Sequence, residues 1–114
     1  MLYTRIATIT VQPGKVSEYL HLCEQDLLPR YRDLPGFVGY TVAKVGDSAL
    51  TAFSLWQTRA QAEHSVTVSD QWLKDAFSKL IISVTHELGE LPFFAFTGEL
   101  KPFTSLAPVG HRPL

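Results

Sequence analysis

Disulfide bonds within the chain are excluded, because its 114 residues include only one cysteine, Cys23. A single thiol is typical of proteins in a reducing compartment, so we expect a cytoplasmic protein. Long hydrophobic runs are missing too, since no stretch approaches the roughly 20 apolar residues that a membrane-spanning helix requires. The first ten residues also lack the basic start and apolar stretch of a secretory signal. The sequence therefore predicts a soluble protein with no membrane partner.

Charge is scarce and balanced. Ten Lys and Arg residues against eleven Asp and Glu give a net charge of -1, and neither sign gathers into a run. Binding to nucleic acid needs a concentrated basic surface, so no nucleic-acid partner is expected. Charged residues make up 18% of the chain and hydrophobic residues 46%. A domain of this size covers only part of its apolar surface by folding, which favours an oligomer or an apolar ligand pocket.

The first half of the chain predicts a strand, a helix and a hairpin. β-Branched residues dominate positions 2 to 11, and Gln12-Pro13-Gly14 ends that strand. Apolar residues then recur at helical spacing; they are Val16, Tyr19, Leu20, Cys23 and Leu27. Pro29 should kink or end this helix, because proline has no N–H to donate. Two β-rich runs follow between residues 37 and 56, and Gly46-Asp47 between them predicts a hairpin turn.

The second half predicts a broken helix. Thr58 and Gln61 have the spacing of a capping box, so a helix should begin directly after the hairpin. The β-branched run Val66-Thr67-Val68 predicts a break, after which Ser69 caps a second amphipathic segment. The apolar stripe of that segment extends to Val84.

The C-terminal region predicts a last strand and an arm. Gly89 should end the second helical segment. Residues 91–100, LPFFAFTGEL, then read as the last strand. Residues 101–114 contain three prolines and are expected to form an extended C-terminal arm.

The resulting order, β-α-β-β-α-β, is that of a ferredoxin-like α+β fold, with a four-stranded antiparallel sheet and both helices on one face. We expect one such domain over residues 1–100. Neither alternating set of the first strand is strongly polar; the sets are Tyr3, Arg5, Ala7, Ile9 and Val11, which we assign to the helix-covered face, and Leu2, Thr4, Ile6, Thr8 and Thr10. A sheet with one face in water alternates polar and apolar residues, so a second sheet should cover the other face.

Three short motifs lie between Leu34 and Leu80: Pro35-Gly36-Phe37-x-Gly39-Tyr40, Leu55-Trp56 at the end of the hairpin, and Ala62-Glu63-His64-x3-Val68. In these motifs the chain resembles the antibiotic biosynthesis monooxygenase family of dimeric α/β barrels. The resemblance implies a homodimer whose two sheet faces pack together, with a ligand cavity between sheet and helices in each subunit. Some members oxidise phenols or quinols with O2 without a metal or flavin, others degrade haem, and many have no assigned activity.

The resemblance implies a cofactor-independent monooxygenase that acts on a small aromatic phenol, a quinol or a polyketide-like substrate. Such chemistry needs a base for the phenolic proton, a donor beside the resulting anion and an apolar pocket. His64 matches a histidine position of the family and is the candidate base, with a surface or capping histidine as the alternative. Arg5 is the candidate to hold the anion, and an ion pair with a core carboxylate such as Glu18 or Glu99 is the alternative.

Aromatic side chains would form the walls of that pocket. The candidates are Trp56, Trp72, Tyr40, Tyr31 and Phe77, any of which can equally be a packing residue. Haem-degrading members use an asparagine in the first strand and a tryptophan and a histidine in the second helical region. Ala7, Ser65 and Asp75 stand at or near those positions, so haem degradation is disfavoured. No metal site and no cofactor are expected, because His21 and Glu24 have no matching second pair.

Two other functions remain open. One is a non-catalytic dimeric module that binds a small hydrophobic ligand, or whose pocket is filled by its own seven Phe, four Tyr and two Trp side chains. The other is an isomerase that would use the same pocket without O2. A cavity of roughly 300 Å³ or more, reached by His64 or Arg5, favours an enzyme, whereas a packed interior favours the module.

Overall fold

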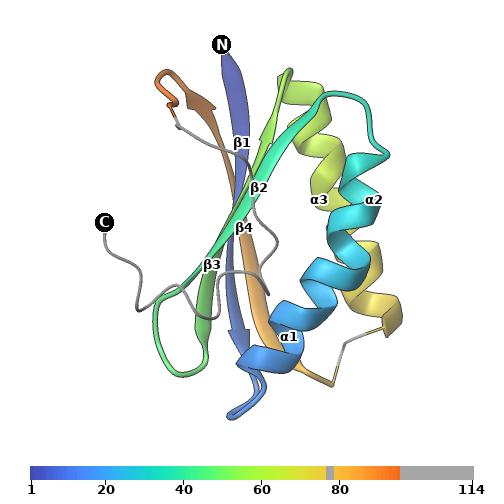
Figure 1. The fold of residues 1–114 in the computed structure, drawn as a ribbon, viewed down its shortest axis with the longest axis vertical. Coiled ribbons are helices and arrows are strands. Elements are labelled where there is room, and N and C mark those ends of the chain that lie inside the picture. Colours follow the sequence, from blue (N-terminus) through green and yellow to red (C-terminus); the bar gives the residue numbers. More distant parts are fainter. Residues whose placement is uncertain (77–78, 96–114) are drawn as a thin grey trace.

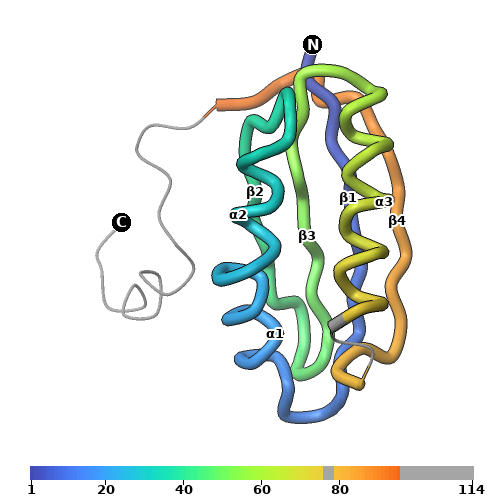
Figure 2. Tube along the Cα trace, turned by 90° about the vertical axis from the view of Figure 1, so that its right-hand side faces the viewer, coloured from blue at the N-terminus to red at the C-terminus, as the bar shows by residue number. Residues whose placement is uncertain are grey.

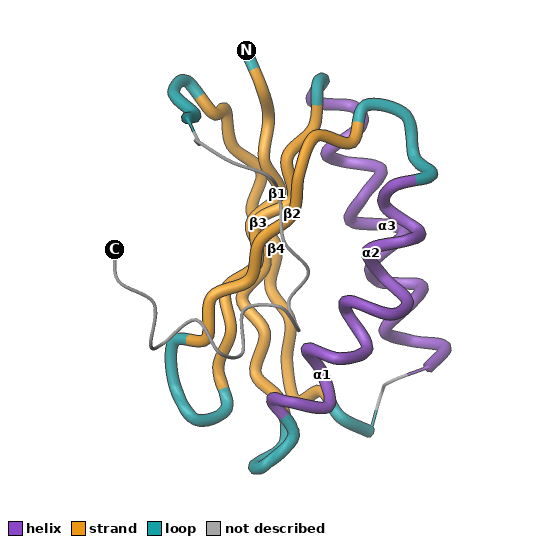
Figure 3. The backbone as a smooth tube through the Cα atoms, in the orientation of Figure 1, coloured by secondary structure: helices purple, strands orange, loops and turns teal. Residues whose placement is uncertain are grey.

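The computed structural model of the chain describes residues 1–76 and 79–95. Four strands form one antiparallel sheet in the order β2-β3-β1-β4. The strands are β1 (Leu2–Val11), β2 (Phe37–Lys44), β3 (Ala49–Trp56) and β4 (Ile81–Leu91). The helices are α1 (Val16–Leu22), a π-helical turn (Cys23–Leu27), α2 (Leu28–Arg32) and α3 (Arg59–Ala76). All of these helices lie on the same side of the sheet (Figures 1 and 3), so the predicted ferredoxin-like fold is confirmed.

The central strand β1 is paired along both edges, with β3 and with β4. Arg5 lies opposite Ser54 of β3 and Leu88 of β4. Residues that are directly opposite each other in a sheet share a face. On this face Ala7 and Ile9 are at most 2% exposed, because α1, α2 and α3 cover it. The predicted assignment of the Arg5 set to the helix-covered face is therefore confirmed, and Figure 2 shows the two helical segments side by side over the sheet.

The helix after β1 does not end at Pro29. The chain stays helical as far as Arg32, with the π-helical turn Cys23–Leu27 between α1 and α2. Pro29 lies in the first turn of α2, where its missing N–H costs least. A π-helical turn contains one residue more than an α-helical turn. Here the π-helical turn lies directly before α2, so Pro29 falls in the first turn of a new α-helical segment.

The break predicted in the next helix is wrong, because α3 is continuous over Arg59–Ala76. The predicted capping box is confirmed. The Thr58 N–H donates to Gln61 Oε1 at 3.0 Å, and the Gln61 N–H donates to Thr58 Oγ1 at 3.2 Å. Ser69, predicted to cap a second segment, is instead buried in the middle of α3. The low helix propensity of β-branched residues is a few tenths of a kcal/mol and is overridden by packing of Val68 against the core.

The predicted last strand is wrong in position. β4 spans Ile81–Leu91, so it includes the residues up to Val84 that were predicted as helix, and Gly89 lies inside it rather than at a helix end. Of the predicted strand at residues 91–100, only Leu91 lies in β4, and residues 92–95 belong to no strand. The rest of that segment, the expected arm at residues 101–114 and Phe77 lie outside the described residues.

The sheet face that points away from the helices carries a single charged residue, Glu87, among its paired positions. These positions are Leu2, Thr4, Ile6, Thr8 and Thr10 of β1, Gly39, Thr41 and Ala43 of β2, Ala49, Thr51, Phe53 and Leu55 of β3, and Ser83, Thr85, Glu87, Gly89 and Leu91 of β4. We call this surface the open face. At its centre the apolar side chains Ile6 and Phe53 lie directly opposite each other, and Glu87 lies opposite Ile6 on the other side.

Candidate functional site

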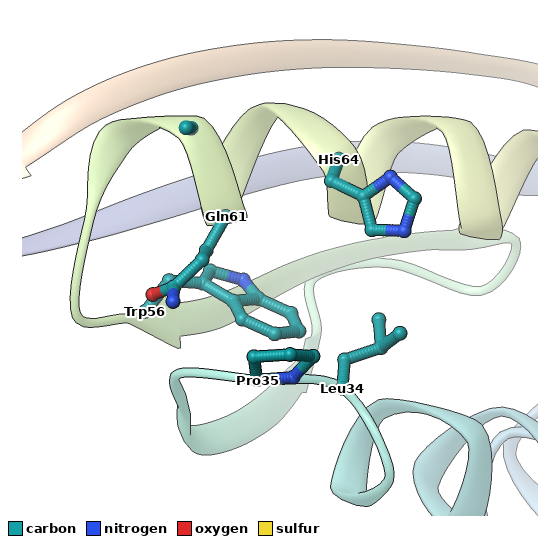
Figure 4. Close-up of a pocket in the computed structure, with 6 residues that line it drawn as sticks. Leu34, Pro35, Trp56, Gln61 and His64 are labelled. Atoms are coloured by element: carbon teal, nitrogen blue, oxygen red, sulfur yellow. The ribbon is translucent and has the colours of Figure 1, made fainter.

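A cleft of about 190 Å³ opens where the turn before β2 meets the first turns of α3. It is lined by Leu34, Pro35, Trp56, Ala60, Gln61 and His64. Figure 4 shows His64 on α3, across the cleft from Leu34 and Pro35. The lining is mostly apolar, and His64 is its one titratable side chain. A neutral aromatic ring is the kind of ligand that such a surface suits.

Gly36 fixes the position of the turn against α3. Its φ of +81° lies in the left-handed region, which favours glycine. The Gln57 N–H donates to the Gly36 carbonyl at 3.0 Å, which ties the turn to the start of α3. A β-carbon at Gly36 would overlap the side chain of Gln61. One wall of the cleft therefore depends on a close approach that only glycine permits.

His64 lies on the exposed side of α3. It makes no hydrogen bond or ion pair with any residue that the structure describes. Both ring nitrogens are thus available to a ligand in the cleft. An exposed histidine without hydrogen bonds is also common on protein surfaces. His64 differs from such a residue because it lines the cleft.

Arg5 does not line the cleft. Its side chain is 1% exposed and packs between the sheet and α3. The Arg5 Nε–H donates to Ser54 Oγ at 3.1 Å, and Nη1 donates to Ser69 Oγ at 3.2 Å. Among the described residues no carboxylate lies within 4.0 Å of the guanidinium. The alternative of an ion pair with Glu18 is wrong, because Glu18 pairs with Lys15 at 3.4 Å on the surface, and Glu99 is outside the described residues.

Aromatic side chains fill the space between the helices and the sheet. Tyr31 lies edge-on to both Trp56 and Tyr40, with ring centroids 5.4 Å apart in each pair. Trp72 packs against Tyr19 at 6.2 Å and donates its indole N–H to Asp26 Oδ2 at 2.6 Å. Of the predicted binding residues that the structure describes, only Trp56 borders the cleft, and it forms a fully buried floor. The implied cavity is occupied by the protein's own side chains.

Burial keeps three tyrosine hydroxyls and the cysteine thiol of the core protonated. Burial raises the pKa of the Tyr31 phenol, although the charge of Arg5 opposes this, and it raises the pKa values of Tyr19 and Tyr40 as well. Burial likewise raises the pKa of the Cys23 thiol to about 12, against the hydrogen bonds from Tyr19 and Tyr40. None of these groups can act as a base near neutral pH. The Tyr31 hydroxyl is also buried without a hydrogen-bond partner among the described residues.

Sequence patterns did not single out His86, which contacts Arg5, or Asp70, which contacts His86. His86 lies in β4 and contacts Arg5, with 3.4 Å between His86 Nδ1 and Arg5 Nη1. Its other nitrogen, Nε2, is 2.8 Å from Asp70 Oδ1. The alternation Val84-x-His86-x-Leu88 was a usable strand signal that placed His86 on an inward face. On the cleft side, the Leu34-Pro35 turn and the capping box were visible in the sequence, but their contact with each other was not.

No helix within residues 1–76 and 79–95 combines the length and apolar character needed to cross a membrane. Over the same residues, no three His, Cys, Asp or Glu side chains gather closely enough to hold a metal ion.

Comparison with known proteins identifies the fold. No family model matches the sequence, and no curated protein does. The solved structures with the same fold include SnoaB, a cofactor-independent oxygenase from Streptomyces nogalater, with a TM-score of 0.62 and 15% identity over 82% of this chain and 95% of SnoaB. They also include a protein provisionally assigned as an antibiotic biosynthesis monooxygenase from Nitrosomonas europaea, with a TM-score of 0.63 and 11% identity over 81% of this chain and 91% of that one.

A third structure, a protein of unknown function from Nitrosomonas europaea, has a TM-score of 0.69 and 16% identity over 86% of this chain and 96% of its own. Identities this low show a shared fold and leave the chemistry open. The chain therefore has the same ferredoxin-like α+β fold as these proteins, which confirms at the level of the fold the resemblance to the antibiotic biosynthesis monooxygenases.

Proposed function

We propose that the chain belongs to the antibiotic biosynthesis monooxygenase family and oxidises a small aromatic phenol or quinol with O2, without a cofactor. The observation that carries the proposal is the unbonded His64 at the edge of an apolar cleft that is open to solvent. A phenol in the cleft transfers its proton to His64. The phenolate is a far better electron donor than the phenol, and the apolar walls limit the water around it.

The reaction needs no other reagent. Transfer of one electron from the phenolate to O2 gives a phenoxyl radical and superoxide, which combine at an unsubstituted ring carbon. His64 returns its proton to the peroxide oxygen, and the resulting hydroperoxide loses water and leaves a quinone. One oxygen atom of O2 enters the product and the other leaves as water, so one phenol and one O2 give one quinone and one H2O.

The volume of the cleft limits the substrate. A buried apolar cavity of about 150 Å³ binds benzene. The cleft, at about 190 Å³, therefore suits one aromatic ring. A fused polyketide would have to extend into solvent, so a single-ring phenol or hydroquinone fits better than the larger substrates that the sequence left open.

Arg5 has a supporting part in this proposal. Its guanidinium lies behind the cleft floor, because Ser54 Oγ accepts hydrogen bonds from both Arg5 Nε and Trp56 Nε1. A buried positive charge is poorly screened and favours a nearby anion. Arg5 would therefore stabilise the phenolate through its field and not through contact.

Oxygen uptake with phenol and with hydroquinone tests the proposal. His64→Ala should lower kcat/KM at least about 100-fold, the lower range for loss of a general base. His21→Ala is the matched control, because His21 is an exposed histidine on α1 away from the cleft. Incorporation of one atom of isotope-labelled O2 into the product identifies an oxygenase, and an isomerised product formed without O2 uptake identifies the isomerase. No O2 uptake by the wild-type protein with either substrate would reject the oxygenase.

The filled interior favours a second candidate, the non-catalytic module. The cleft is smaller than roughly 300 Å³, and Arg5 is enclosed rather than presented to a ligand. Calorimetric titration with p-cresol under air separates the candidates. Saturable binding with no O2 uptake supports the module, whereas uptake that follows the binding curve supports the oxygenase.

We also propose that the protein is a homodimer in which the two open faces pack together. The support is the chemistry of that face, with one charged residue, Glu87, and an apolar centre at Ile6 and Phe53. A sheet face that stays in water normally alternates apolar with polar or charged residues.

A further inference from the structure

Five side chains form a continuous hydrogen-bonded chain from the surface of α3 to the floor of the cleft. It begins at Asp70, whose Oδ1 is 2.8 Å from His86 Nε2. His86 Nδ1 is 3.4 Å from Arg5 Nη1, near the long limit for a hydrogen bond. The Arg5 Nε–H donates to Ser54 Oγ at 3.1 Å, and the Trp56 indole N–H donates to the same oxygen at 2.9 Å.

The direction of each bond follows from the chemistry of the groups. A guanidinium has only donors, so His86 Nδ1 must accept from Arg5 and cannot carry a proton. The proton of the neutral ring is therefore on Nε2, where it donates to the Asp70 carboxylate. Arg5 thus selects one of the two tautomers of His86, and Asp70 stabilises the same one.

The hydrogen-bonded series of side chains also explains how the fold accommodates a buried cation. The guanidinium of Arg5 is 1% exposed and has no carboxylate in direct contact among the described residues. An isolated buried charge is strongly destabilising. The Asp70 carboxylate, whose side chain is 59% exposed, lies one imidazole away and provides the opposite charge. Hydrogen bonds to Ser54 and Ser69 stabilise the guanidinium further, and its Cζ atom lies 5.6 Å from the centroid of the Tyr31 ring.

We propose that Asp70 and His86 are positioning residues that act through Arg5 and Ser54 to fix the Trp56 indole as the floor of the cleft. Neither residue lines the cleft. This inference deepens the proposed function, because the floor decides how deeply a ring can enter beside His64. The ring of Trp56 packs against Tyr31 and Phe37 in the core, and the indole bond to Ser54 sets its rotation.

The first test reads the tautomer of His86 directly. Long-range ¹H–¹⁵N spectra of the wild-type protein distinguish a protonated Nε2 from a protonated Nδ1, and loss of the signal in His86→Gln assigns it. We expect a proton on Nε2 and none on Nδ1. A neutral His86 ring protonated on Nδ1 would contradict the proposed hydrogen bonds to Arg5 and Asp70, whatever reaction the protein catalyses.

The second test monitors the indole N–H of Trp56, the last group of the hydrogen-bonded series. The protein has two tryptophans, so the spectrum contains two indole N–H peaks, which Trp56→Phe assigns. His86→Leu should shift the Trp56 peak and leave that of Trp72, whose N–H is bonded to Asp26. His86→Gln should restore the wild-type position, because glutamine can accept from Arg5 and donate to Asp70.

A surface variant makes the test independent of core packing. Asp70→Ala removes a half-exposed carboxylate and should shift the Trp56 peak in the same direction as His86→Leu. Asp75→Ala is the matched control, because Asp75 is an exposed carboxylate of the same helix that bonds to Gln71. A Trp56 peak that stays in place in both His86→Leu and Asp70→Ala, or a Trp72 peak that moves equally, would refute the positioning role.

Kinetics connect the chain to the proposed function. In His86→Leu the KM for hydroquinone should rise about tenfold, the low end for altered pocket contacts, with kcat unchanged. An equal fall in kcat would place His86 in the chemical step and overturn the positioning role. If the wild-type protein consumes no O2, the proposed function is rejected. The two spectroscopic tests still show whether the hydrogen bonds from Asp70 to Trp56 position the indole.

Discussion

At the scale of single residues, Gly36 combines two constraints that can be measured separately. Gly14 and Gly36 have nearly the same backbone conformation, with φ of +78° and +81°. A β-carbon at Gly14 would meet nothing within 4 Å, whereas at Gly36 it would overlap Gln61. The pair of positions thus separates the cost of a left-handed conformation from the cost of moving the cleft wall.

Gly14→Ala should lower the free energy of unfolding by about 1–2 kcal/mol, the cost of a left-handed conformation. Gly36→Ala should lower it by that amount plus about 0.5–2 kcal/mol, because Gln61 must leave the capping box. Urea denaturation with unchanged m-values measures both. Equal losses in the two variants would mean that the Gln61 contact contributes nothing.

Cys23 should be inert in the native protein. Its thiol is fully buried, and its pKa is raised to about 12, so almost no thiolate is present at pH 8. A chromogenic disulfide reagent should react with Cys23 only at the rate of unfolding, and should react at once in urea. Rapid labelling of the folded protein at pH 8 would contradict the described packing.

The same shifts predict alkaline destabilisation. In the folded protein the pKa values of Cys23, Tyr19, Tyr31 and Tyr40 are raised, so the neutral forms are favoured there. The stability gained from these groups is complete below the pKa of the unfolded thiol, near 8.5, and is lost as the pH rises toward the folded values. The urea midpoint should therefore fall between about pH 8.5 and 12. In Cys23→Ala the decline should begin at a higher pH.

At the scale of elements, the sequence predicted their order correctly, but it predicted a break in α3 that does not exist and placed the last strand too late in the chain. The apolar residues up to Val84 continue the helical stripe of α3, so periodicity alone extended the helix. The run Ile81-Ile82-Ser83-Val84-Thr85 is rich in β-branched residues and becomes β4, because pairing with β1 satisfies its backbone. At Val66-Thr67-Val68 the prediction relied on low helix propensity, and tertiary packing overrode that propensity. At residues 81–84 the prediction relied on helical periodicity, although the β propensity of these residues indicated the strand that forms.

The candidate site was predicted less completely than the fold. The face of Arg5 followed from the alternation in β1, because a strand has a period of two. The partners of Arg5 lie 49, 64 and 81 residues away and depend on tertiary packing that no local pattern encodes. His64 was found through a motif, but its contact with the Leu34-Pro35 turn required the docking of α3 against that turn.

The π-helical turn brings Asp26 to the indole N–H of Trp72, which joins the first helical segment to α3. Asp26→Ala should lower the free energy of unfolding by about 1.5–3 kcal/mol, the range for a hydrogen bond to a charged group. Arg30→Ala is the control, because it removes only the exposed partner of Asp26, 3.5 Å away. Chemical denaturation measures both variants, and similar small losses would show that the bond to Trp72 is not important for stability.

At the scale of the whole molecule, the open face predicts the mass in solution. Light scattering coupled to gel filtration should give twice the mass of the 12.7 kDa chain. Phe53→Glu places a charge at the centre of the open face and should yield monomers, because burial of an unpaired carboxylate is strongly unfavourable. Thr67→Glu, on the exposed surface of α3, should remain dimeric. A monomeric wild-type protein would reject the dimer.

The position of β1 at the centre of the sheet has a consequence for synthesis on the ribosome. β1 emerges first, yet its two neighbours in the sheet are residues 49–56 and 81–91. The side chain of Arg5 obtains its last partner only when His86 has left the exit tunnel. A nascent chain that ends before β4 leaves the first strand with one bare edge and a cation without its counter-charge. We therefore expect the sheet to form only after residues 81–91 have left the exit tunnel.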